Sequence, residues 1–215
     1  MTDILEIKVC GMTQIAQVRE LAELGINYAG FIFYEKSPRY VVGRFKPEEL
    51  RQVSAAINKV GVFVNEDYDT ILKIVDEYGL NAVQLHGDET PDLCARLSSH
   101  IKTIKAFRLA GDEDFTLLLN GYADTVDFFL FDTKAKEYGG TGKKFNWKVL
   151  DQSVIEKPFF LSGGIGADDA HLTADFIRKK SETKIIPDLN SRFENAPGIK
   201  NMEAVKKFVN EIRKT

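Results

Sequence analysis

The sequence predicts a single (β/α)₈ barrel that spans residues 1–215. Short apolar segments alternate with segments of helical periodicity along the chain, and we count eight such units. The apolar segments are continuous rather than alternately apolar and polar, which is typical of parallel strands covered on both faces. Eight units in 215 residues fit a barrel near the small end of its size range, roughly 200 residues upward.

The rival fold is a doubly wound open sheet. Such a sheet usually carries a G-x-G-x-x-G turn after its first strand. The corresponding turn here reads Cys10-Gly11-Met12-Thr13, which does not match. No Pro-, Gly- or Ser-rich stretch is long enough to link two domains. We therefore expect one barrel domain.

Each apolar segment is expected to form one strand of the barrel. The expected strands are Glu6–Cys10, Tyr28–Phe33, Val60–Val64, Ala82–Leu85, Thr103–Phe107, Phe128–Asp132, Phe159–Ser162 and Lys184–Leu189.

The intervening segments are expected to form helices. Ser, Thr, Asp and Asn favour the position that caps a helix, and proline fits the first helical turn. Leu50, Val53 and Ile57 are expected on one face of the second helix. The segments after Phe107 and Phe145 predict weaker helices. The expected helix starts are marked by Thr13, Pro47, Asp67, Thr90 with Pro91, Asp168 and Asn201.

Composition argues against several classes of protein. A formal net charge of -3 argues against a general nucleic-acid binder, which needs clustered Lys and Arg. The apolar runs are too short to cross a bilayer, and the amino terminus lacks the pattern of a signal peptide. Two cysteines provide neither a zinc quartet nor a disulfide framework. We expect a cytoplasmic protein without nucleic-acid or membrane partners.

The active site of such a barrel lies at the carboxyl ends of its strands. Arg39 lies on the loop after the second expected strand. The candidates at the strand ends are Cys10, Asn65, Gln84, His86, Arg108, Asp132, Gly163, Gly164, Asp188 and Asn190.

A phosphate site is expected on the loops after the seventh and eighth strands. Ser162-Gly-Gly-Ile-Gly166 leads into a helix, and glycines let backbone N–H groups approach an anion. The next loop supplies the polar residues Asn190 and Ser191 beside it. Gly163 and Gly164 alone would favour a tight turn over a phosphate site. Together, the two loops favour phosphate.

Several candidates have a structural interpretation as well. A lone cysteine such as Cys10 after an apolar strand is more often an inert core residue than a reactive one. Asp132 ends an apolar run, where its carboxylate needs a partner. A salt bridge to Lys134 or a turn cap competes equally with catalysis. His86 fits a hydrogen-bonded residue at a strand end, and Arg39 fits a solvated loop charge. No spacing of His, Cys or carboxylates offers a divalent metal enough ligands.

Several segments in this order resemble phosphoribosylanthranilate isomerases. The resemblance runs from the first strand to Lys200. Any one segment is a weak signal, whereas the ordered set is a strong one. The segments are Lys8-Val-Cys-Gly-Met-Thr13, Gly30-Phe-Ile-Phe-Tyr-Glu-Lys-Ser-Pro-Arg-Tyr40, Gly61-Val-Phe-Val64, Val83-Gln-Leu-His-Gly87, Phe131-Asp-Thr-Lys134, Gly139-Gly-Thr-Gly142 and Ser162-Gly-Gly-Ile-Gly166.

The resemblance implies an isomerase of tryptophan biosynthesis. It would convert N-(5-phosphoribosyl)anthranilate to 1-(2-carboxyphenylamino)-1-deoxyribulose 5-phosphate by an Amadori rearrangement, without metal or organic cofactor. Its partners would be this small phosphosugar and, by contact, other enzymes of the tryptophan pathway. The alternatives are another phosphosugar barrel isomerase or epimerase, or a non-catalytic barrel that binds a phosphosugar.

The family pattern also implies residue roles. Asp132 would be the acid that opens the ribose ring, and Cys10 the base that removes the C2 proton. A thiol base requires surroundings that stabilise its thiolate. Arg39 would bind the anthranilate carboxylate, Asp188 would face the amine, and His86 would support Cys10. The phosphate would be held by Gly163, Gly164, Asn190 and Ser191.

The loop after the eighth strand departs from the family pattern. Arg192 stands where a glycine is usual, and Asn190 where a serine is usual. The Asn190 amide can still donate a hydrogen bond. Arg192 would either change the local backbone or add a positive charge toward the phosphate.

Overall fold

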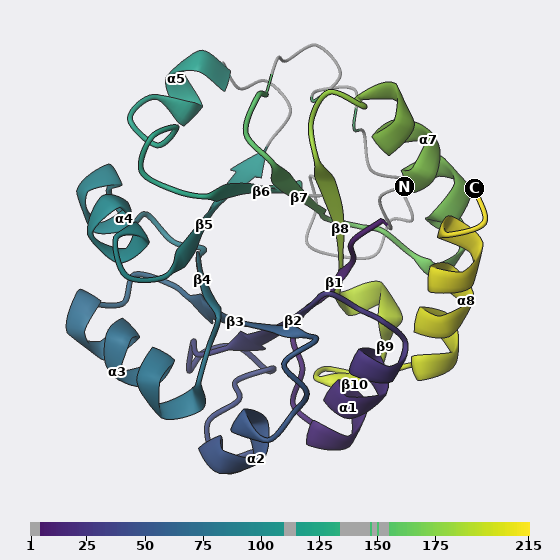
Figure 1. The fold of residues 1–215 in the computed structure, drawn as a ribbon, viewed down its shortest axis with the longest axis horizontal. Coiled ribbons are helices and arrows are strands. Elements are labelled where there is room, and N and C mark those ends of the chain that lie inside the picture. Colours follow the sequence, from purple (N-terminus) through teal and green to yellow (C-terminus); the bar gives the residue numbers. More distant parts are fainter. Residues whose placement is uncertain (1–4, 110–114, 134–146, 148–149, 151–154) are drawn as a thin grey trace.

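The computed structural model describes residues 5–109, 115–133, 147, 150 and 155–215. Its strands form a closed parallel barrel in which β1 to β8 follow one another in chain order, ringed by helices (Figure 1). The prediction of a (β/α)₈ barrel is therefore confirmed. The helix expected after Phe145, the Gly139–Gly142 segment and Lys134 lie outside the described residues.

The strands match the expected segments closely, apart from the first, which is shorter than Glu6–Cys10. The register joins Lys8 of the first strand to Tyr28 on one side and to Asp188 on the other, which closes the barrel. The strands are β1 Lys8–Val9, β2 Tyr28–Ile32, β3 Asn58–Phe63, β4 Ala82–Leu85, β5 Lys102–Leu109, β6 Phe128–Thr133, β7 Phe159–Ser162 and β8 Ile185–Leu189.

Helices cover the outer face of the barrel, and a short hairpin follows β8 (Figure 1). The α-helices are α1 Ile15–Glu23, α2 Pro47–Arg51, α3 Tyr68–Tyr78, α4 Pro91–Ser98, α5 Phe115–Leu119, α7 Ala170–Lys179 and α8 Met202–Ile212. Two 3₁₀ turns, η1 Ala167–Asp169 and η2 Ser191–Phe193, and the hairpin of β9 Glu194–Ala196 with β10 Ile199–Lys200 complete the described elements.

Three of the expected helix caps are confirmed. The side chains of Asp67, Thr90 and Asn201 each accept a hydrogen bond from the backbone N–H three residues later. This contact satisfies one of the N–H groups left free at the start of an α-helix.

Three other expectations about helices need correction. Thr13 does not cap α1; its hydroxyl donates instead to the carbonyl of Gly198 at 2.7 Å, and the helix begins two residues later. The helix that starts at Pro47 ends at Arg51, so Val53 and Ile57 are buried outside it. The helix expected from Asp168 is preceded by the η1 turn and begins at Ala170.

The barrel interior changes from apolar to polar along the strands. Successive side chains of a strand alternate between its two faces. Ile186 of β8 and Leu130 of β6 therefore face inward, where they belong to one buried apolar cluster with Ile104. Two residues further along β8 and β6, the inward positions hold Asp188 and Asp132. These two inward-facing carboxylates therefore lie toward the carboxyl end of the barrel.

A larger apolar core lies between the sheet and the helices and includes Val9, Phe31 and Leu161. In the described part of the chain, no helix is both long enough and apolar enough to span a membrane.

Candidate active site

Cys10 follows β1 directly and is 4% exposed. Its backbone N–H donates to the carbonyl of Leu189 at 2.8 Å, which extends the pairing of β1 with β8. Its sulfur lies against Gly30 of β2, where a β-carbon would come within 2.6 Å of Sγ. The absence of a side chain at Gly30 thus makes the room that the thiol occupies.

Lys8 lies two residues before Cys10 and was not among the sequence candidates. Its side chain is fully buried, with Nζ 3.0 Å from Asp188 Oδ2 and 2.8 Å from Gln84 Oε1. Burial alone would lower the pKa of Lys8, but the Asp188 carboxylate raises it above its ordinary value. Lys8 therefore remains an ammonium group inside the barrel. A lysine within an apolar strand was the signal in the sequence that could have identified it.

The Cys10 thiol is held in its neutral form in this structure. Burial raises its pKa, while the positive charges of Lys8 and Lys200 act in the opposite direction. A raised pKa does not match the stabilised thiolate that a thiol base requires. The two lysines nevertheless supply the positive surroundings that favour a thiolate once it forms.

A chain of polar contacts leads from Lys8 to Asp132. An ammonium group has only donors, so the Gln84 atom that faces Lys8 is the carbonyl oxygen. The Gln84 amide nitrogen then faces His86 Nδ1 at 2.8 Å and donates to it. The proton of a neutral His86 ring is thereby placed on Nε2, which lies 3.5 Å from Asp132 Oδ2. His86 was expected beside Cys10, whereas these contacts place its ring between Gln84 and Asp132.

Asp132 lies near the carboxyl end of β6, and its side chain is 34% exposed. It is paired in register with Arg108 of β5 and Ser162 of β7. Arg108 Nη2 donates to the carbonyl of His86 at 3.4 Å, which ties the loop after β4 to the same rim. The competing partner Lys134 lies outside the described residues.

Asp188 is buried against Lys8, at the Lys8 end of this series of polar contacts. Burial raises its pKa, and the Lys8 ammonium acts against that shift. Its Oδ2 accepts from Lys8, but its Oδ1 is buried without a hydrogen-bond partner among the described residues. A buried carboxylate oxygen without a donor is costly, so a ligand that brings an N–H or O–H group would be favoured here.

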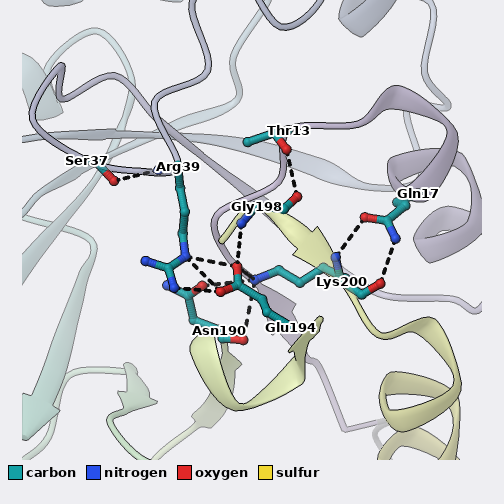
Figure 2. Close-up of polar contacts among 8 residues, drawn as sticks. All are labelled: Thr13, Gln17, Ser37, Arg39, Asn190, Glu194, Gly198 and Lys200. Atoms are coloured by element: carbon teal, nitrogen blue, oxygen red, sulfur yellow. Dashed lines mark hydrogen bonds and ion pairs between the residues drawn. The ribbon is translucent and has the colours of Figure 1, made fainter. Parts of the chain in front are cut away.

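Arg39 is bound by Glu194 of the hairpin after β8 (Figure 2). Its Nε donates to both carboxylate oxygens at 2.9 and 3.0 Å, and its Nη2 donates to Oε2 at 2.6 Å. Arginine has five N–H donors, so the contacts to Glu194 leave the outer edge of the guanidinium available. The interpretation of Arg39 as a solvated loop charge is therefore wrong.

Glu194 also accepts from the buried Lys200 at 2.8 Å and from the backbone N–H of Gly198 (Figure 2). Burial acts to raise the pKa of Glu194, but Arg39 and Lys200 hold it below its usual range. Lys200 donates as well to Asn190 Oδ1 at 2.9 Å, which turns the Asn190 amide nitrogen away from the lysine. Neither Glu194 nor Lys200 was among the sequence candidates, although both fall in the segment compared with the family.

Gly11 packs against this cluster and has a φ of 76°, a conformation that side chains disfavour. A β-carbon there would come within 2.6 Å of Arg39 Cδ and 2.8 Å of Asn190 Oδ1. Arg39 and Asn190 therefore converge directly beside the residue that follows Cys10.

The two expected phosphate loops lie in contact. Gly163 and Gly164 have φ angles of 90° and 70°, which leaves a loop that few other residues could form. Arg192 Nη1 reaches across it and donates to the carbonyl of Gly164 at 2.6 Å. Its side chain remains 54% exposed, beside the exposed Ser191. The same nitrogen lies 3.5 Å from Asp169 Oδ2, so Arg192 brings to this loop a positive charge that it shares with a carboxylate.

A further buried ion pair supports the loop after β4. Lys105 Nζ lies 2.8 Å from Glu89 Oε2, and Glu89 also accepts from the backbone N–H groups of Gly87 and Asn65. This pair fixes the segment that carries His86. A lysine inside the apolar fifth strand was its signal in the sequence.

The sequence candidates thus fall into three connected groups at one end of the barrel. The described residues contain no group of three or more His, Cys, Asp or Glu that could hold a metal ion. The groups are Cys10, Asp188, His86 and Asp132 around Lys8 and Gln84; Arg39 and Asn190 joined through Glu194 and Lys200; and the glycine loop of Gly163 and Gly164, which Arg192 contacts at Gly164 beside Ser191. Asn65 and Arg108 contact the loop after β4.

Comparison with known proteins gives a consistent result. The family model of N-(5'-phosphoribosyl)anthranilate (PRA) isomerase matches residues 7–211. The N-(5'-phosphoribosyl)anthranilate isomerase of Parabacteroides distasonis is 43% identical over 209 residues, which cover 96% of this chain and 92% of that protein. The protein of the same name from Phocaeicola vulgatus is 40% identical and covers 96% of this chain and 97% of its own length.

Solved structures agree in fold. The crystal structure of phosphoribosyl anthranilate isomerase from Thermotoga maritima has a TM-score of 0.82 at 33% identity and covers 98% of this chain and 100% of its own. A second isomerase structure, in complex with reduced 1-(o-carboxyphenylamino)-1-deoxyribulose 5-phosphate, has a TM-score of 0.79 at 30% identity and the same coverage of both chains.

Proposed function

The chain belongs to the N-(5'-phosphoribosyl)anthranilate isomerase family, and we propose that Cys10 and Asp132 are the base and the acid of its reaction. As an isomerase of tryptophan biosynthesis, it converts N-(5-phosphoribosyl)anthranilate to 1-(2-carboxyphenylamino)-1-deoxyribulose 5-phosphate. Carbon 1 of the sugar is reduced and carbon 2 is oxidised, so the reaction needs no external electron acceptor.

The first step opens the ribose ring. Asp132 gives its proton to the ring oxygen while the bond from C1 to that oxygen breaks, and the lone pair of the anthranilate nitrogen forms an iminium group. Asp132 is suited to this step because it is the partly exposed carboxyl group at the rim of the barrel. His86 Nε2, on which the contact with Gln84 places the N–H of a neutral ring, lies 3.5 Å from Asp132 Oδ2.

The second step removes the proton from C2. The Cys10 thiolate takes this proton, and the electron pair of the C–H bond forms the C1–C2 double bond of an enolamine, which becomes the ketone on tautomerisation. Lys8 and Lys200 favour the thiolate, although burial keeps the resting thiol neutral. The reaction is therefore expected to draw on a small thiolate fraction that grows with pH.

Asp188 would stabilise the iminium intermediate. Its Oδ1 is the buried acceptor without a partner among the described residues, and the substrate nitrogen carries an N–H at this stage. A hydrogen bond from that N–H would satisfy the carboxylate while the nitrogen is positively charged.

The two anionic ends of the substrate fit the two remaining groups. The free outer edge of the Arg39 guanidinium can bind the anthranilate carboxylate with two parallel hydrogen bonds. Gly163, Gly164, Asn190 and Ser191 would hold the phosphate, with the Asn190 amide nitrogen turned outward by Lys200. Arg192 lies close enough to the glycine loop to add its charge.

The observation that carries this assignment is the polar chain from Lys8 through Gln84 and His86 to Asp132. It joins β1, which Cys10 follows directly, to β6, which carries Asp132, across the carboxyl end of the barrel.

The decisive experiment is turnover of freshly generated phosphoribosylanthranilate in the presence of EDTA. We expect full activity, because the described residues offer no metal site. Loss of activity that a divalent ion restores would instead support an epimerase-like enzyme. Binding of the reduced product analogue without turnover would support a non-catalytic phosphosugar-binding barrel. A cytoplasmic location and contact with other enzymes of the tryptophan pathway stay predictions.

A further inference from the structure

The cluster of Arg39, Glu194 and Lys200 contains one more positive than negative charge. Two cations share a single carboxylate, with Arg39 at 2.6 Å and Lys200 at 2.8 Å from its oxygens. The side chains of Lys200 and Glu194 are 0% and 4% exposed, whereas that of Arg39 is 19% exposed. The excess charge therefore reaches the site through Arg39.

Glu194 poses a problem for the carboxylate site proposed above. A guanidinium that is bound by a carboxylate on two of its nitrogens is already neutralised. If Glu194 faced Arg39 alone, the pair would have no net charge and would attract a second carboxylate poorly. Only a further cation on Glu194 leaves Arg39 with charge to offer.

We propose that Lys200 is a positioning residue whose ammonium neutralises Glu194 and so keeps Arg39 available for the substrate carboxylate. Glu194 then aims the guanidinium without cancelling its charge. The lysine occupies a suitable place for this role, because it is fully buried and its other contacts go to Asn190. Burial lowers the pKa of Lys200 and Glu194 opposes that shift, as expected for a cation maintained by its pairing. This inference rests on the proposed binding of the carboxylate by Arg39.

Formal charges of the three residues predict the order of ligand affinities. The wild-type cluster has a net charge of +1. Lys200→Met has a net charge of 0, whereas the double variant Glu194→Gln/Lys200→Met returns to +1. If the net charge of the cluster sets the affinity, adding Glu194→Gln restores the ligand binding that Lys200→Met weakens.

The experiment measures the Kd of the reduced product analogue by calorimetry, and kcat and KM for the substrate. Lys200→Met should weaken binding of the analogue about tenfold or more, as for one weakened charge-assisted hydrogen bond. KM should rise in parallel, with a smaller change in kcat. The double variant should bind within about threefold of wild type. Lys59→Met is the matched control, since Lys59 is 6% exposed and its ammonium donates to the Val53 carbonyl at the other end of the barrel; it should leave both constants unchanged.

Arg39→Gln separates failure of this inference from failure of the proposed function. If Arg39→Gln leaves the Kd of the analogue unchanged, Arg39 does not bind the carboxylate and the proposed site is wrong. If Arg39→Gln weakens binding but Lys200→Met does not, only the role of Lys200 is wrong.

The double variant decides between charge and structure. If Lys200 has only a structural role, Glu194→Gln/Lys200→Met should bind the analogue as weakly as Lys200→Met or more weakly. That result would overturn the proposal. If Lys200→Met alone does not fold, as judged by circular dichroism, the affinity of the double variant still tests the inference. A Kd within about threefold of wild type supports it, and a tenfold loss rejects it.

Discussion

The sulfur of Cys10 fills the place where a side chain on Gly30 would begin. A β-carbon on Gly30 would lie 2.6 Å from Sγ and 3.1 Å from the Cys10 α-carbon. The neighbouring strand thus limits the position of the thiol on one side, and the Lys8 ammonium opposes the rise in its pKa that burial causes.

Gly30→Ala should therefore act mainly on kcat. The added methyl group must displace the thiol, and a shift of about 1 Å in a reacting group can cost roughly 100-fold in rate. We expect kcat to fall by about 10- to 100-fold while the Kd of the reduced product analogue changes little. Circular dichroism and thermal unfolding check that the variant folds. An unchanged kcat would argue against a role of Cys10 in the chemistry.

The two cysteines provide a matched pair of variants. Cys10 and Cys94 are both buried and unpaired, but Cys94 lies on α4, outside the barrel. Cys10→Ala should lower kcat by about 10²–10⁴-fold, the usual worth of a general base, with little loss of analogue binding. Cys94→Ala should lower only the thermal midpoint, because it leaves a small cavity. Equal activities of the two variants would assign Cys10 to the core.

The thiolate fraction of Cys10 should rise toward alkaline pH. Burial raises the pKa of the Cys10 thiol, so the thiolate fraction is small at pH 7 and grows about tenfold per pH unit below that pKa. The rate itself is a poor measure of this fraction, because the proton that Asp132 must supply is lost in the same direction. The ultraviolet absorbance of the thiolate, measured from pH 6 to 9 as the difference between Cys94→Ala and Cys10→Ala/Cys94→Ala, should show the increase. Lys8→Met should displace the rise to higher pH, because it removes a positive charge beside the thiolate. A thiolate absorbance that stays absent over the whole range would contradict the thiol as base.

Asp132→Asn tests the acid. The amide is nearly isosteric with the carboxyl group but cannot deliver a proton to the ring oxygen. We expect a loss of about 10²–10⁴-fold in the single-turnover rate, because product release can mask the chemical step in steady state. If Asp132 only formed a surface ion pair, the cost would be about 0–1 kcal/mol of stability with turnover retained. A variant that keeps about half of the wild-type rate would remove Asp132 from the mechanism.

The buried carboxylate Glu89 should make stability depend on acid pH. Burial acts to raise the pKa of Glu89, but Lys105 and backbone N–H groups hold it below its ordinary value of 4.5. A depressed folded-state pKa gives stability that is present above pH 4.5 and lost as pH falls through the lower folded value. Chemical denaturation between pH 7 and pH 3 measures this loss. Glu89→Gln/Lys105→Met should flatten that part of the curve, and an equally steep curve would exclude the pair as its source.

The fold was predictable because the same pattern, an apolar segment followed by a segment of helical periodicity, recurs along the sequence. Eight continuous apolar segments set the strand count, and their ends located Cys10, Asp132 and Asp188 at the mouth of the barrel. A helix prediction was wrong where a long-range contact overrides the capping preference of a residue. Thr13 is a good cap by composition, yet its hydroxyl bonds to Gly198, 185 residues away.

The supporting residues of the site could not be paired from sequence. Lys8 and Lys105 stand out as charges in apolar strands, but their partners Asp188 and Glu89 are set by barrel closure and by a loop. The neutral state of the Cys10 thiol was also missed, because it depends on how completely the surrounding strands bury the sulfur.

The ion pair between Lys8 and Asp188 has a consequence for the order of events during synthesis. The two residues are 180 positions apart, so the first strand leaves the ribosome long before its counterion exists. A buried ammonium without a partner is costly, and long-range contacts form late because of the chain entropy they consume. We therefore expect a nascent chain that ends before β8 to keep its first strand undocked and sensitive to protease, with docking on release of the last strand.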